Sequence, residues 1–403
     1  MLTASYDPAL ASGVAKSVST EAQGLAVRGH EIVVVTRRLD RNWSSHQWLD
    51  DHEVYRYRVP EVGSRLFLIN PLYTLTKLPG LIRKLHQRRP FDVAYVHNPY
   101  QATAALLLAR LDIPMVYAFH FPLSEDIRIE AQYGKFRSLG PLMKAMALVV
   151  RAAECHALQQ ADLVVVHSDF MRELMQKTSG VSPPRSPVKL LPLAVDTQRF
   201  TPPSDREAVR VSLGVPRDRD VLLTVRRLVG RMGLVNLIDA LAIVVEHNPR
   251  AMLLIGGTGY LESTLHERIC RLGVGKHVRL LGFISETQLP LYYQAADLFV
   301  LPTEQMEGFG LVTIESLSCG TPVIATPVSA NPEVVGPLDP AFLCADVTPE
   351  ALAERINWWL DHGISPQLRR TCREYCVSRF SIDGVVTSLE DMLSRSAGST
   401  GMR

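Results

Sequence analysis

Short apolar runs alternate with longer amphipathic segments along almost the whole chain. In the first half, buried-type runs such as residues 31–36 and 162–167 are separated by helical patterns, and the alternation starts again after residue 205. Strands that alternate with helices form parallel sheets with helices on both faces. With 403 residues, of which 47% are hydrophobic, the chain can bury two cores. The sequence therefore predicts an α/β protein of two doubly wound domains.

The Pro- and Ser-rich run 201–205 is the expected linker between the two domains. We expect a first domain at residues 1–198 and a second domain at residues 206–379. The small polar residues 396–403 are expected to form a disordered tail. Residues 1–5 look like the end of a strand, so the first strand is either short or begins upstream of Met1.

The charge and the cysteine content limit which cellular compartments and which partners suit this sequence. The net charge is only +2, which does not favour nucleic acid as a partner, but residues 1–195 carry 23 Lys and Arg against 17 Asp and Glu. This basic first half suits an anionic acceptor or membrane surface, or is merely uneven surface charge. The six cysteines have no metal-ligand spacing and are typical of reduced thiols in the cytoplasm.

No apolar run reaches the roughly 18 residues that span a bilayer, and no signal peptide is apparent. The segment 64–89 combines apolar positions with Lys and Arg. It is either a core-facing helix with a basic edge or a helix that lies on anionic lipid. We therefore expect a cytoplasmic protein, either free or peripheral at the inner membrane face.

Residues 301–326 contain the most informative motif. A strand ends at Leu301, the turn Gly308-Phe-Gly310 follows, and a helix carries Glu315. Backbone N–H groups at such a helix start favour phosphate or sugar oxygens. Glu315 can accept hydrogen bonds from both hydroxyls of a ribose, and Glu307 can accept hydrogen bonds from a second polyol. The residues alone leave two interpretations open: a nucleotide-sugar site, or an ordinary strand–turn–helix with solvated glutamates.

Other polar residues lie where open α/β sheets bind ligands. His97 and His120 each follow a predicted strand, and carboxyl ends of strands are the usual ligand-binding edge. Either histidine could instead be structural. Gly13 opens a helix after the first strand, where an anion would bind. The surrounding sequence is not a G-x-G-x-x-G fingerprint, which disfavours a dehydrogenase.

The sequence E-G-F-G-L-V-T-I-E at 307–315, followed by C-G-T-P-V-I-A-T at 319–326, resembles the donor-site signature of retaining glycosyltransferases of family 4. The segments S-G-V-A-K-S-V at 12–18 and R-G-H-E-I-V-V-V-T at 28–36 resemble the amino-terminal pattern of that family. The resemblance implies the GT-B fold, in which two Rossmann-like domains with parallel sheets face each other across a cleft. It also implies that a helix at about 380–395 crosses back onto the first domain.

The resemblance implies transfer of a hexosyl unit from a UDP- or GDP-sugar to a hydroxyl acceptor, which is a glycan, a lipid-linked molecule or a small molecule, with retention at the anomeric carbon. Such enzymes act in polysaccharide or glycolipid biosynthesis. The implied catalytic residues are His120, Glu307 and Arg227. The implied donor- and phosphate-binding residues are Gly13, Arg227, Arg231, Phe283, Ile284, Phe309, Gly310, Leu311 and Glu315.

No D-x-D element follows a suitable strand, so arginines are expected to balance the charge of the departing diphosphate without a metal or another cofactor. Arg227 stands in the position of the family's phosphate-binding arginine. The family's usual lysine is replaced by Met232, and Arg231 could supply the missing charge. Two alternatives remain: a sugar-nucleotide epimerase or hydrolase on the same fold, and a nucleotide-sugar-binding pseudoenzyme.

Overall fold

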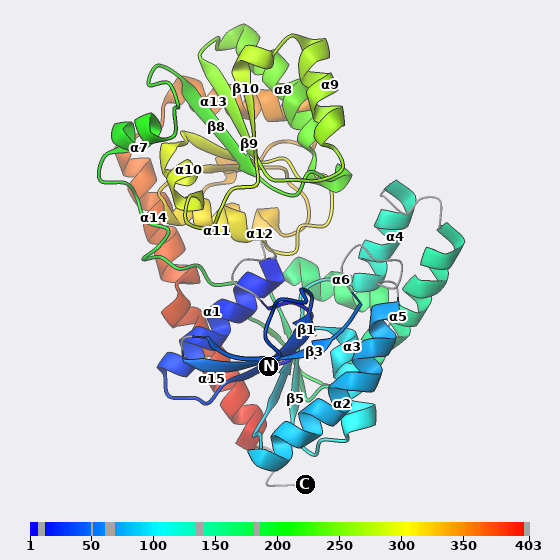
Figure 1. The fold of residues 1–403 in the computed structure, drawn as a ribbon. Helices are drawn as coiled ribbons and strands as arrows, with labels where there is room; N and C mark the ends of the chain where they lie inside the picture. The colour runs from blue at the N-terminus through cyan, green and yellow to red at the C-terminus, as the bar shows by residue number, and fades with distance from the viewer. Residues whose placement is uncertain (7–12, 50, 61–68, 134–139, 181–185, 399–403) are drawn as a thin grey trace. The chain divides into compact units, whose positions relative to one another are not determined.

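The computed structural model describes residues 1–6, 13–49, 51–60, 69–133, 140–180 and 186–398. The chain divides into two compact units (Figure 1). The first contains residues 1–132, 136–194 and 382–403, and the second is built on Val195–Ser381. Each unit is a largely parallel sheet with helices packed on it, so the predicted α/β class is confirmed.

The sheet of the first unit consists of two runs of strands, in the orders β1-β3-β2 and β4-β5-β6-β7. Leu2 joins the runs because it bridges Val35 in one and Val96 in the other. Among the described strands, pairing is parallel except between β2 and β3. The strands are β1 (Val33–Arg38), β2 (His46–Leu49), β3 (His52–Arg58), β4 (Ala94–Val96), β5 (Met115–Phe119), β6 (Leu163–Val166) and β7 (Val188–Leu190).

The helices of the first unit bury apolar faces against this sheet. In the basic segment, Leu78, Ile82 and Leu85 repeat at helical spacing and are buried, whereas Lys84 and Arg88 are exposed. This is the core-facing interpretation, although residues 64–68 lie outside the described part of the chain. The helices are α1 (Gly13–Val27), α2 (Asn70–Arg88), α3 (Pro99–Thr103), the π-helical turn η2 (Ala104–Ala109), α4 (Leu123–Tyr133), α5 (Gly140–Gln160), α6 (Asp169–Ser179) and α15 (Ile382–Gly398).

The carboxyl-terminal helix α15 packs closely against α1 in the first unit. A Cβ at Gly24 would lie 2.6 Å from Cγ2 of Val386, so glycine allows the two helices to approach. Arg28, directly after α1, forms an ion pair with Glu390 on α15 at 2.8 Å. The helix extends through Ser396 to Gly398, whereas the sequence suggested an unfolded tail from Ser396; residues 399–403 lie outside the described part.

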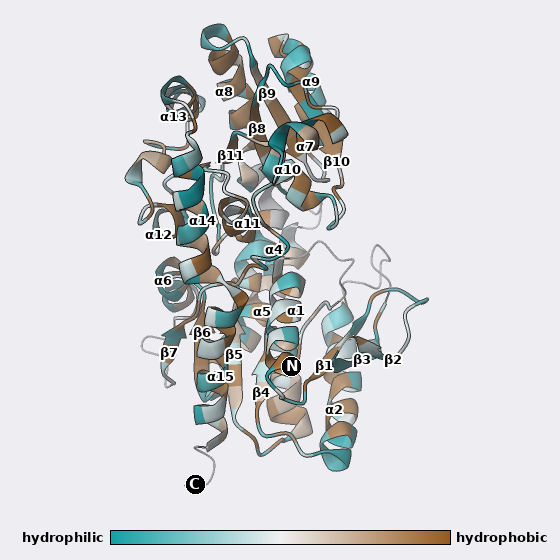
Figure 2. Ribbon diagram, turned by 90° about the vertical axis from the view of Figure 1, so that its left-hand side faces the viewer, coloured by the Kyte–Doolittle hydropathy of each residue, from teal (hydrophilic) through white to brown (hydrophobic). Residues whose placement is uncertain are grey.

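The second unit contains a parallel sheet with the order β10-β9-β8-β11-β12. Figure 2 shows the apolar character of β8 and β9, which matches their nearly complete burial. Strands buried on both faces read as continuous apolar runs, which explains why they were recognisable in the sequence. The strands are β8 (Asp220–Val225), β9 (Ala251–Gly256), β10 (Val278–Gly282), β11 (Leu298–Leu301) and β12 (Val323–Ala325).

A partly buried carboxylate ties the first helix of the second unit to its sheet. Asp297, just before β11, accepts hydrogen bonds from Arg206 at 2.6 Å and from Arg210 at 2.5 Å. The helices are α7 (Arg206–Ser212), α8 (Leu234–His247), α9 (Glu262–Leu272), α10 (Leu289–Ala295), α11 (Leu311–Ser318), α12 (Asn331–Val335), α13 (Pro349–His362) and α14 (Pro366–Phe380), with short 3₁₀ turns η4 (Gly230–Met232), η5 (Gly275–His277) and η6 (Pro340–Phe342).

The sequence also raised the state of the cysteines and the question of a membrane-spanning segment. All six cysteines are free thiols, and those at 319, 344, 372 and 376 are buried. Within the described residues, no helix combines the length and the apolar character that crossing a membrane requires.

Candidate functional site

In the second unit, the loops that follow two neighbouring strands meet. Residues 226–233 follow β8 and residues 302–310 follow β11, and these strands pair in parallel. Gly233 has a φ of +69°, and a Cβ there would lie 1.7 Å from the carbonyl oxygen of Pro302. Glycine is therefore required where the two backbones touch.

A third loop, residues 257–259 after β9, lies against the loop after β8. Gly257 has a φ of +132°, and its Cβ would lie 1.7 Å from the carbonyl oxygen of Arg226. A Cβ at Gly259 would lie 2.3 Å from the carbonyl oxygen of Leu228. The glycines thus let three loops pack backbone to backbone at the carboxyl ends of β8, β9 and β11, where such sheets bind ligands.

Arg226 and Glu307 form an ion pair between two of these loops. The Arg226 side chain is only 4% exposed, and that of Glu307 is 13% exposed. Nη1 of Arg226 donates to Oγ1 of Thr303 at 2.5 Å, and Nη2 donates to Oε2 of Glu307. Oγ1 of Thr303 in turn donates to the same carboxylate oxygen at 3.3 Å. No described residue hydrogen-bonds the other oxygen, Oε1, so Glu307 is held by one oxygen only.

Arg227, which the family resemblance singled out, lies outside this ion pair. Its side chain is exposed, whereas Arg226 before it is buried, as expected for alternate residues that continue from a strand. Nη1 of Arg231 donates to the carbonyl of Met306 at 2.9 Å. Met232 is buried in the position where the family usually has lysine. Arg226 was not predicted from the sequence, although a signal was present in the pair of arginines directly after a buried strand.

The helix α11 starts beside Glu307. Its N-cap, Gly310, has a φ of +87°, and a Cβ there would lie 3.7 Å from Cδ of Glu307. In the described structure, the backbone N–H groups of Phe309, Gly310 and Leu311 donate no hydrogen bond. The hydroxyl of Thr313 is also buried without a partner among the described residues. Open donors at the positive end of a helix, next to a carboxylate, can hold phosphate and sugar oxygens.

Glu315 lies one turn further along α11 and is buried. Oη of Tyr293, on α10, donates to its Oε2 at 2.8 Å. Burial raises the pKa of Tyr293 well above its usual value, with the Glu315 charge as the next cause, so the phenol remains a donor. A buried carboxylate needs such a partner to stay ordered.

Phe283 and Ile284 follow β10, and Ile284 packs on the end of β9. Ile284 is buried, and its Cδ1 would lie 2.4 Å from a Cβ at Gly256. Phe283 is 58% exposed, so its ring face is accessible. The N–H of Gly257 donates to the carbonyl of Gly282 at 2.7 Å. An accessible aromatic ring beside a glycine loop is a suitable surface for a nucleobase.

The first unit contains a row of three histidines at the carboxyl ends of β4, β5 and β6. Nδ1 of His97 lies 2.9 Å from Nε2 of His120, and Nδ1 of His120 lies 3.0 Å from Nε2 of His167. Nδ1 of His167 lies 2.9 Å from the carbonyl oxygen of Leu191. Burial lowers the pKa of His97 and His120 well below the usual value and that of His167 to about 4. The three imidazole rings are therefore neutral near pH 7.

The predicted site residues thus fall into two groups. Glu307, Glu315, Arg231 and the turn at residues 309–311 lie together in the second unit, with Arg227 exposed on the same loop as Arg231. His120 and Gly13, the first residue of α1, belong to the first unit. A cavity of about 550 Å³ in that unit is lined by residues that begin strands, such as Val33 and Ala94. It lies at the amino ends of the strands, opposite the edge that carries the histidines.

Comparison with known families gives two matches that together span most of the chain. The family described as "Glycosyl transferases group 1" matches residues 205–377, and "Glycosyltransferase Family 4" matches residues 11–199. The first match contains the loops around Arg226 and Glu307, and the second contains the histidine row.

Similar proteins include named glycosyltransferases. The D-inositol 3-phosphate glycosyltransferase of Jonesia denitrificans is 28% identical over 397 residues, which is 94% of this chain and 90% of that protein. The GDP-mannose-dependent alpha-(1-6)-phosphatidylinositol monomannoside mannosyltransferase of Mycolicibacterium smegmatis is 35% identical over 199 residues, 47% of this chain and 51% of that protein.

Solved structures resemble the chain over nearly its full length. Sucrose-phosphate synthase from Thermosynechococcus elongatus has a TM-score of 0.81 at 21% identity, over 99% of this chain and 98% of that one. Such a likeness shows the fold, whereas the family matches show the activity class. The chain therefore belongs to the family 4 glycosyltransferases and is a transferase with the GT-B fold.

Proposed function

We propose that the enzyme transfers a hexosyl unit from a nucleoside diphosphate sugar to a hydroxyl acceptor, with retention of configuration. The observation that carries this proposal is the geometry around Glu307. One carboxylate oxygen is fixed by Arg226, the other is open, and unpaired N–H groups of the α11 start lie beside it. The open carboxylate oxygen can accept hydrogen bonds from sugar hydroxyls, and the adjacent N–H groups can donate hydrogen bonds to phosphate oxygens.

The other residues of the second unit supply the nucleotide contacts in this proposal. Glu315, oriented by Tyr293, accepts the ribose hydroxyls. The exposed ring of Phe283 stacks on the base. The glycine contacts bring the loops after β8, β9 and β11 together, and Ile284 after β10 packs on Gly256 at the end of β9.

We further propose that cationic side chains and helix-start amides, rather than a metal ion, stabilise the departing diphosphate. Arg227 and Arg231 lie on the loop after β8, and guanidinium groups bind phosphate in a bidentate manner. The departing phosphate oxygen takes the proton of the acceptor hydroxyl as the new glycosidic bond forms on the same face. Fixed charges that meet charge developing in the transition state are effective because they need no reorganisation.

For the acceptor, we propose an inositol that carries a phosphate, either free or as part of a phospholipid. The support comes from the relatives, whose names specify inositol 3-phosphate or phosphatidylinositol monomannoside as acceptors. The donor of one of these relatives is GDP-mannose. An anionic acceptor also suits the basic first half of the chain.

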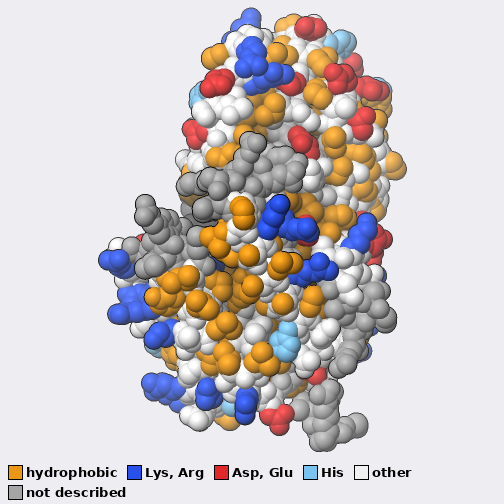
Figure 3. Space-filling model, turned by 90° about the vertical axis from the view of Figure 1, so that its right-hand side faces the viewer, with side chains coloured by type: hydrophobic (Ala, Val, Ile, Leu, Met, Phe, Trp, Pro, Cys, Tyr) orange, Lys and Arg blue, Asp and Glu red, His pale blue; other side chains and the backbone are white. Residues whose placement is uncertain are grey.

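A lipid acceptor would require contact with a membrane surface, which we include as part of the proposal. Exposed apolar side chains lie on α2, η2 and α5, namely Leu72, Leu107, Leu108, Leu142, Leu148 and Val149. Figure 3 shows hydrophobic side chains gathered on one face of the first unit, with lysines and arginines at its margin. Apolar side chains bordered by basic ones favour anionic lipid surfaces.

A donor and acceptor panel tests the function. We would incubate the full chain with GDP-mannose, UDP-glucose or UDP-N-acetylglucosamine, and with inositol 3-phosphate or phosphatidylinositol vesicles. We expect one donor to give a product whose anomeric configuration, read by NMR, equals that of the donor. An inverted product would contradict retention, and tight nucleotide binding without transfer in any pair would contradict the enzymatic proposal. Transfer to inositol 3-phosphate but not to vesicles would place the acceptor in solution.

A further inference from the structure

The direction of each hydrogen bond in the histidine row follows from its last member. The carbonyl oxygen of Leu191 can only accept, so Nδ1 of His167 carries the proton and its Nε2 carries a lone pair. His120 must then donate from Nδ1 to that lone pair, which leaves its own Nε2 as an acceptor. His97 in turn donates from Nδ1 to His120. One backbone carbonyl thus sets the tautomer of three rings.

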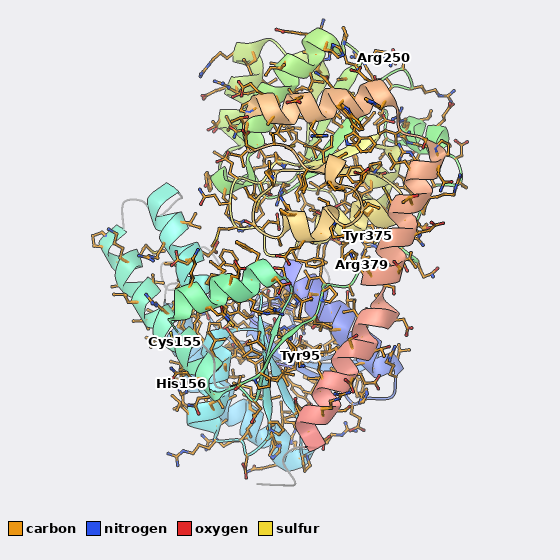
Figure 4. All side chains as sticks on the ribbon, turned by 180° about the vertical axis from the view of Figure 1, so that it is seen from behind. Tyr95, Cys155, His156, Arg250, Tyr375 and Arg379 are labelled. Atoms are coloured by element: carbon orange, nitrogen blue, oxygen red, sulfur yellow. The ribbon has the colours of Figure 1, made fainter. Side chains whose placement is uncertain are left out.

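The row of hydrogen bonds ends at Nε2 of His97. In this arrangement that nitrogen carries no proton and has a lone pair that can accept a hydrogen bond. His97 is only 7% exposed, and Nε2 has no hydrogen-bond partner among the described residues. Its ring packs edge-on against the ring of Tyr95, with centroids 4.3 Å apart, and Tyr95 lies inside the first unit (Figure 4). A buried acceptor without a donor is costly and is uncommon in folded proteins.

The position of this lone pair points to a ligand rather than to a packing defect. His97 directly follows β4, and Asn98 after it caps α3 by accepting from the N–H of Tyr100 at 3.0 Å. The side chain therefore stands at the carboxyl edge of the parallel sheet, which is the ligand-binding edge in such folds. His120 and His167 follow the next two strands on the same edge.

We propose that Nε2 of His97 accepts a hydrogen bond from a hydroxyl group of a bound sugar or polyol, and that His120 and His167 are positioning residues that fix its tautomer. This inference rests on the proposed function, because it assigns a hydroxyl-bearing substrate to the same enzyme. The chemistry excludes an anionic group at this point, since a lone pair repels phosphate and carboxylate oxygens. It also gives His120 a different role from direct contact with the reacting sugar, because both of its ring nitrogens are already engaged.

The first test is the tautomer pattern, which needs no activity. The full chain, labelled with ¹⁵N in its histidine rings, is observed by NMR at pH 7. We expect His97, His120 and His167 to be neutral with the proton on Nδ1, each assigned by loss of its signals in the corresponding phenylalanine variant. A proton on Nε2 of His97 would overturn the inference.

The second test adds ligands to the same sample. The nucleoside diphosphate alone should leave the Nε2 signal of His97 in place. GDP-mannose or UDP-glucose should shift it if the hydroxyl belongs to the donor, and inositol 3-phosphate should shift it if the hydroxyl belongs to the acceptor. Saturating binding of all of these ligands with an unmoved signal would overturn the inference. A shifted signal without glycosyl transfer in any pair would instead contradict the proposed function alone.

Variants separate positioning from mere packing. His97→Phe should raise the KM of the hydroxyl-bearing substrate roughly three- to tenfold, the loss expected for one hydrogen bond. His97→Gln, which keeps a side-chain oxygen as acceptor, should recover part of that loss. His167→Phe should raise the same KM and allow the Nε2–H tautomer of His97 to appear. Equal KM values in His97→Phe, His97→Gln and the wild type would exclude the role, even if melting temperatures differ.

Discussion

Arg226 and Glu307 are joined by an ion pair that leaves one oxygen of the glutamate open beside the start of α11. The pair links the loop after β8 to the loop after β11, so it fixes the orientation of the carboxylate. Its neighbour Arg227 is exposed and takes no part in it. The two adjacent arginines therefore have separable roles, one in positioning and one, in our proposal, in phosphate binding.

Arg226→Gln should lower the free energy of unfolding by about 3 kcal/mol, because a largely buried carboxylate loses its partner. Transfer activity should fall as well, since Glu307 loses its fixed orientation. The measurement is urea unfolding together with turnover. The double variant Arg226→Gln/Glu307→Gln should recover most of the stability but not the activity. Wild-type stability in the single variant would show that the ion pair does not hold the loops.

Arg227→Ala should leave the free energy of unfolding within about 0.5 kcal/mol of the wild type, since the side chain is exposed. If the guanidinium meets phosphate, kcat/KM should fall roughly ten- to hundredfold, the range for a hydrogen bond to a charged group. Arg271→Ala, an exposed arginine on α9, serves as the control. Equal kcat/KM in both variants would remove Arg227 from the mechanism.

Tyr293→Phe removes the hydrogen bond that the phenol donates to Glu315. We expect stability to fall by about 1–3 kcal/mol and nucleotide affinity to weaken, measured by calorimetry with GDP and UDP. Glu315→Gln should weaken nucleotide binding further, because a neutral amide accepts ribose hydroxyls less well. Tyr292→Phe, the partly buried neighbour on α10, is the matched control. Unchanged nucleotide affinity in the Tyr293 and Glu315 variants would count against the ribose role.

Glu21→Gln tests a titration in the buried part of α1. Burial raises the pKa of Glu21 to about 8, and the hydrogen bond from Ser17 only partly opposes this. Between the unfolded value near 4.5 and about 8, the folded protein binds more protons, so wild-type stability is lost as pH rises through this range. The free energy of unfolding of the glutamine variant should not fall for this reason. Relative to the wild type, its free energy of unfolding should rise between pH 5 and 8, by up to about 1.4 kcal/mol per pH unit.

The measurement is urea unfolding at several pH values, with Glu173→Gln on the exposed side of α6 as the control. A difference between wild type and Glu21→Gln that stays constant with pH would mean that Glu21 is ionised in the folded protein.

Chelation tests the proposed source of positive charge. Because arginines and amides are proposed to stabilise the diphosphate, turnover should be unchanged after treatment with EDTA and dialysis. Loss of turnover that manganese or magnesium restores would assign this role to a cation instead. Binding of nucleotide alone, measured in parallel, separates an effect on the donor from an effect on the chemical step.

The sequence allowed prediction of the fold class and of the glycine turn because both depend on local patterns. Buried parallel strands are continuous apolar runs, and the turn at Gly310 needs a residue that tolerates positive φ. Arg226 was missed because the partner of a buried arginine lies 81 positions away, on another strand's loop. His167 carries the same signal as His97 and His120, because it directly follows a strand, but only the strand order of the sheet places it beside His120.

The bare backbone contacts at Gly233, Gly257 and Gly259 have a mechanical consequence. With no side chain between them to change rotamer, the three loops have no soft layer that could absorb a displacement. A ligand that pushes on the loop after β8 must carry the other two with it. The groups that we propose to bind the phosphates and the transferred sugar lie on these loops and should therefore respond as one rigid unit, so a substitution that loosens one loop should weaken both contacts together.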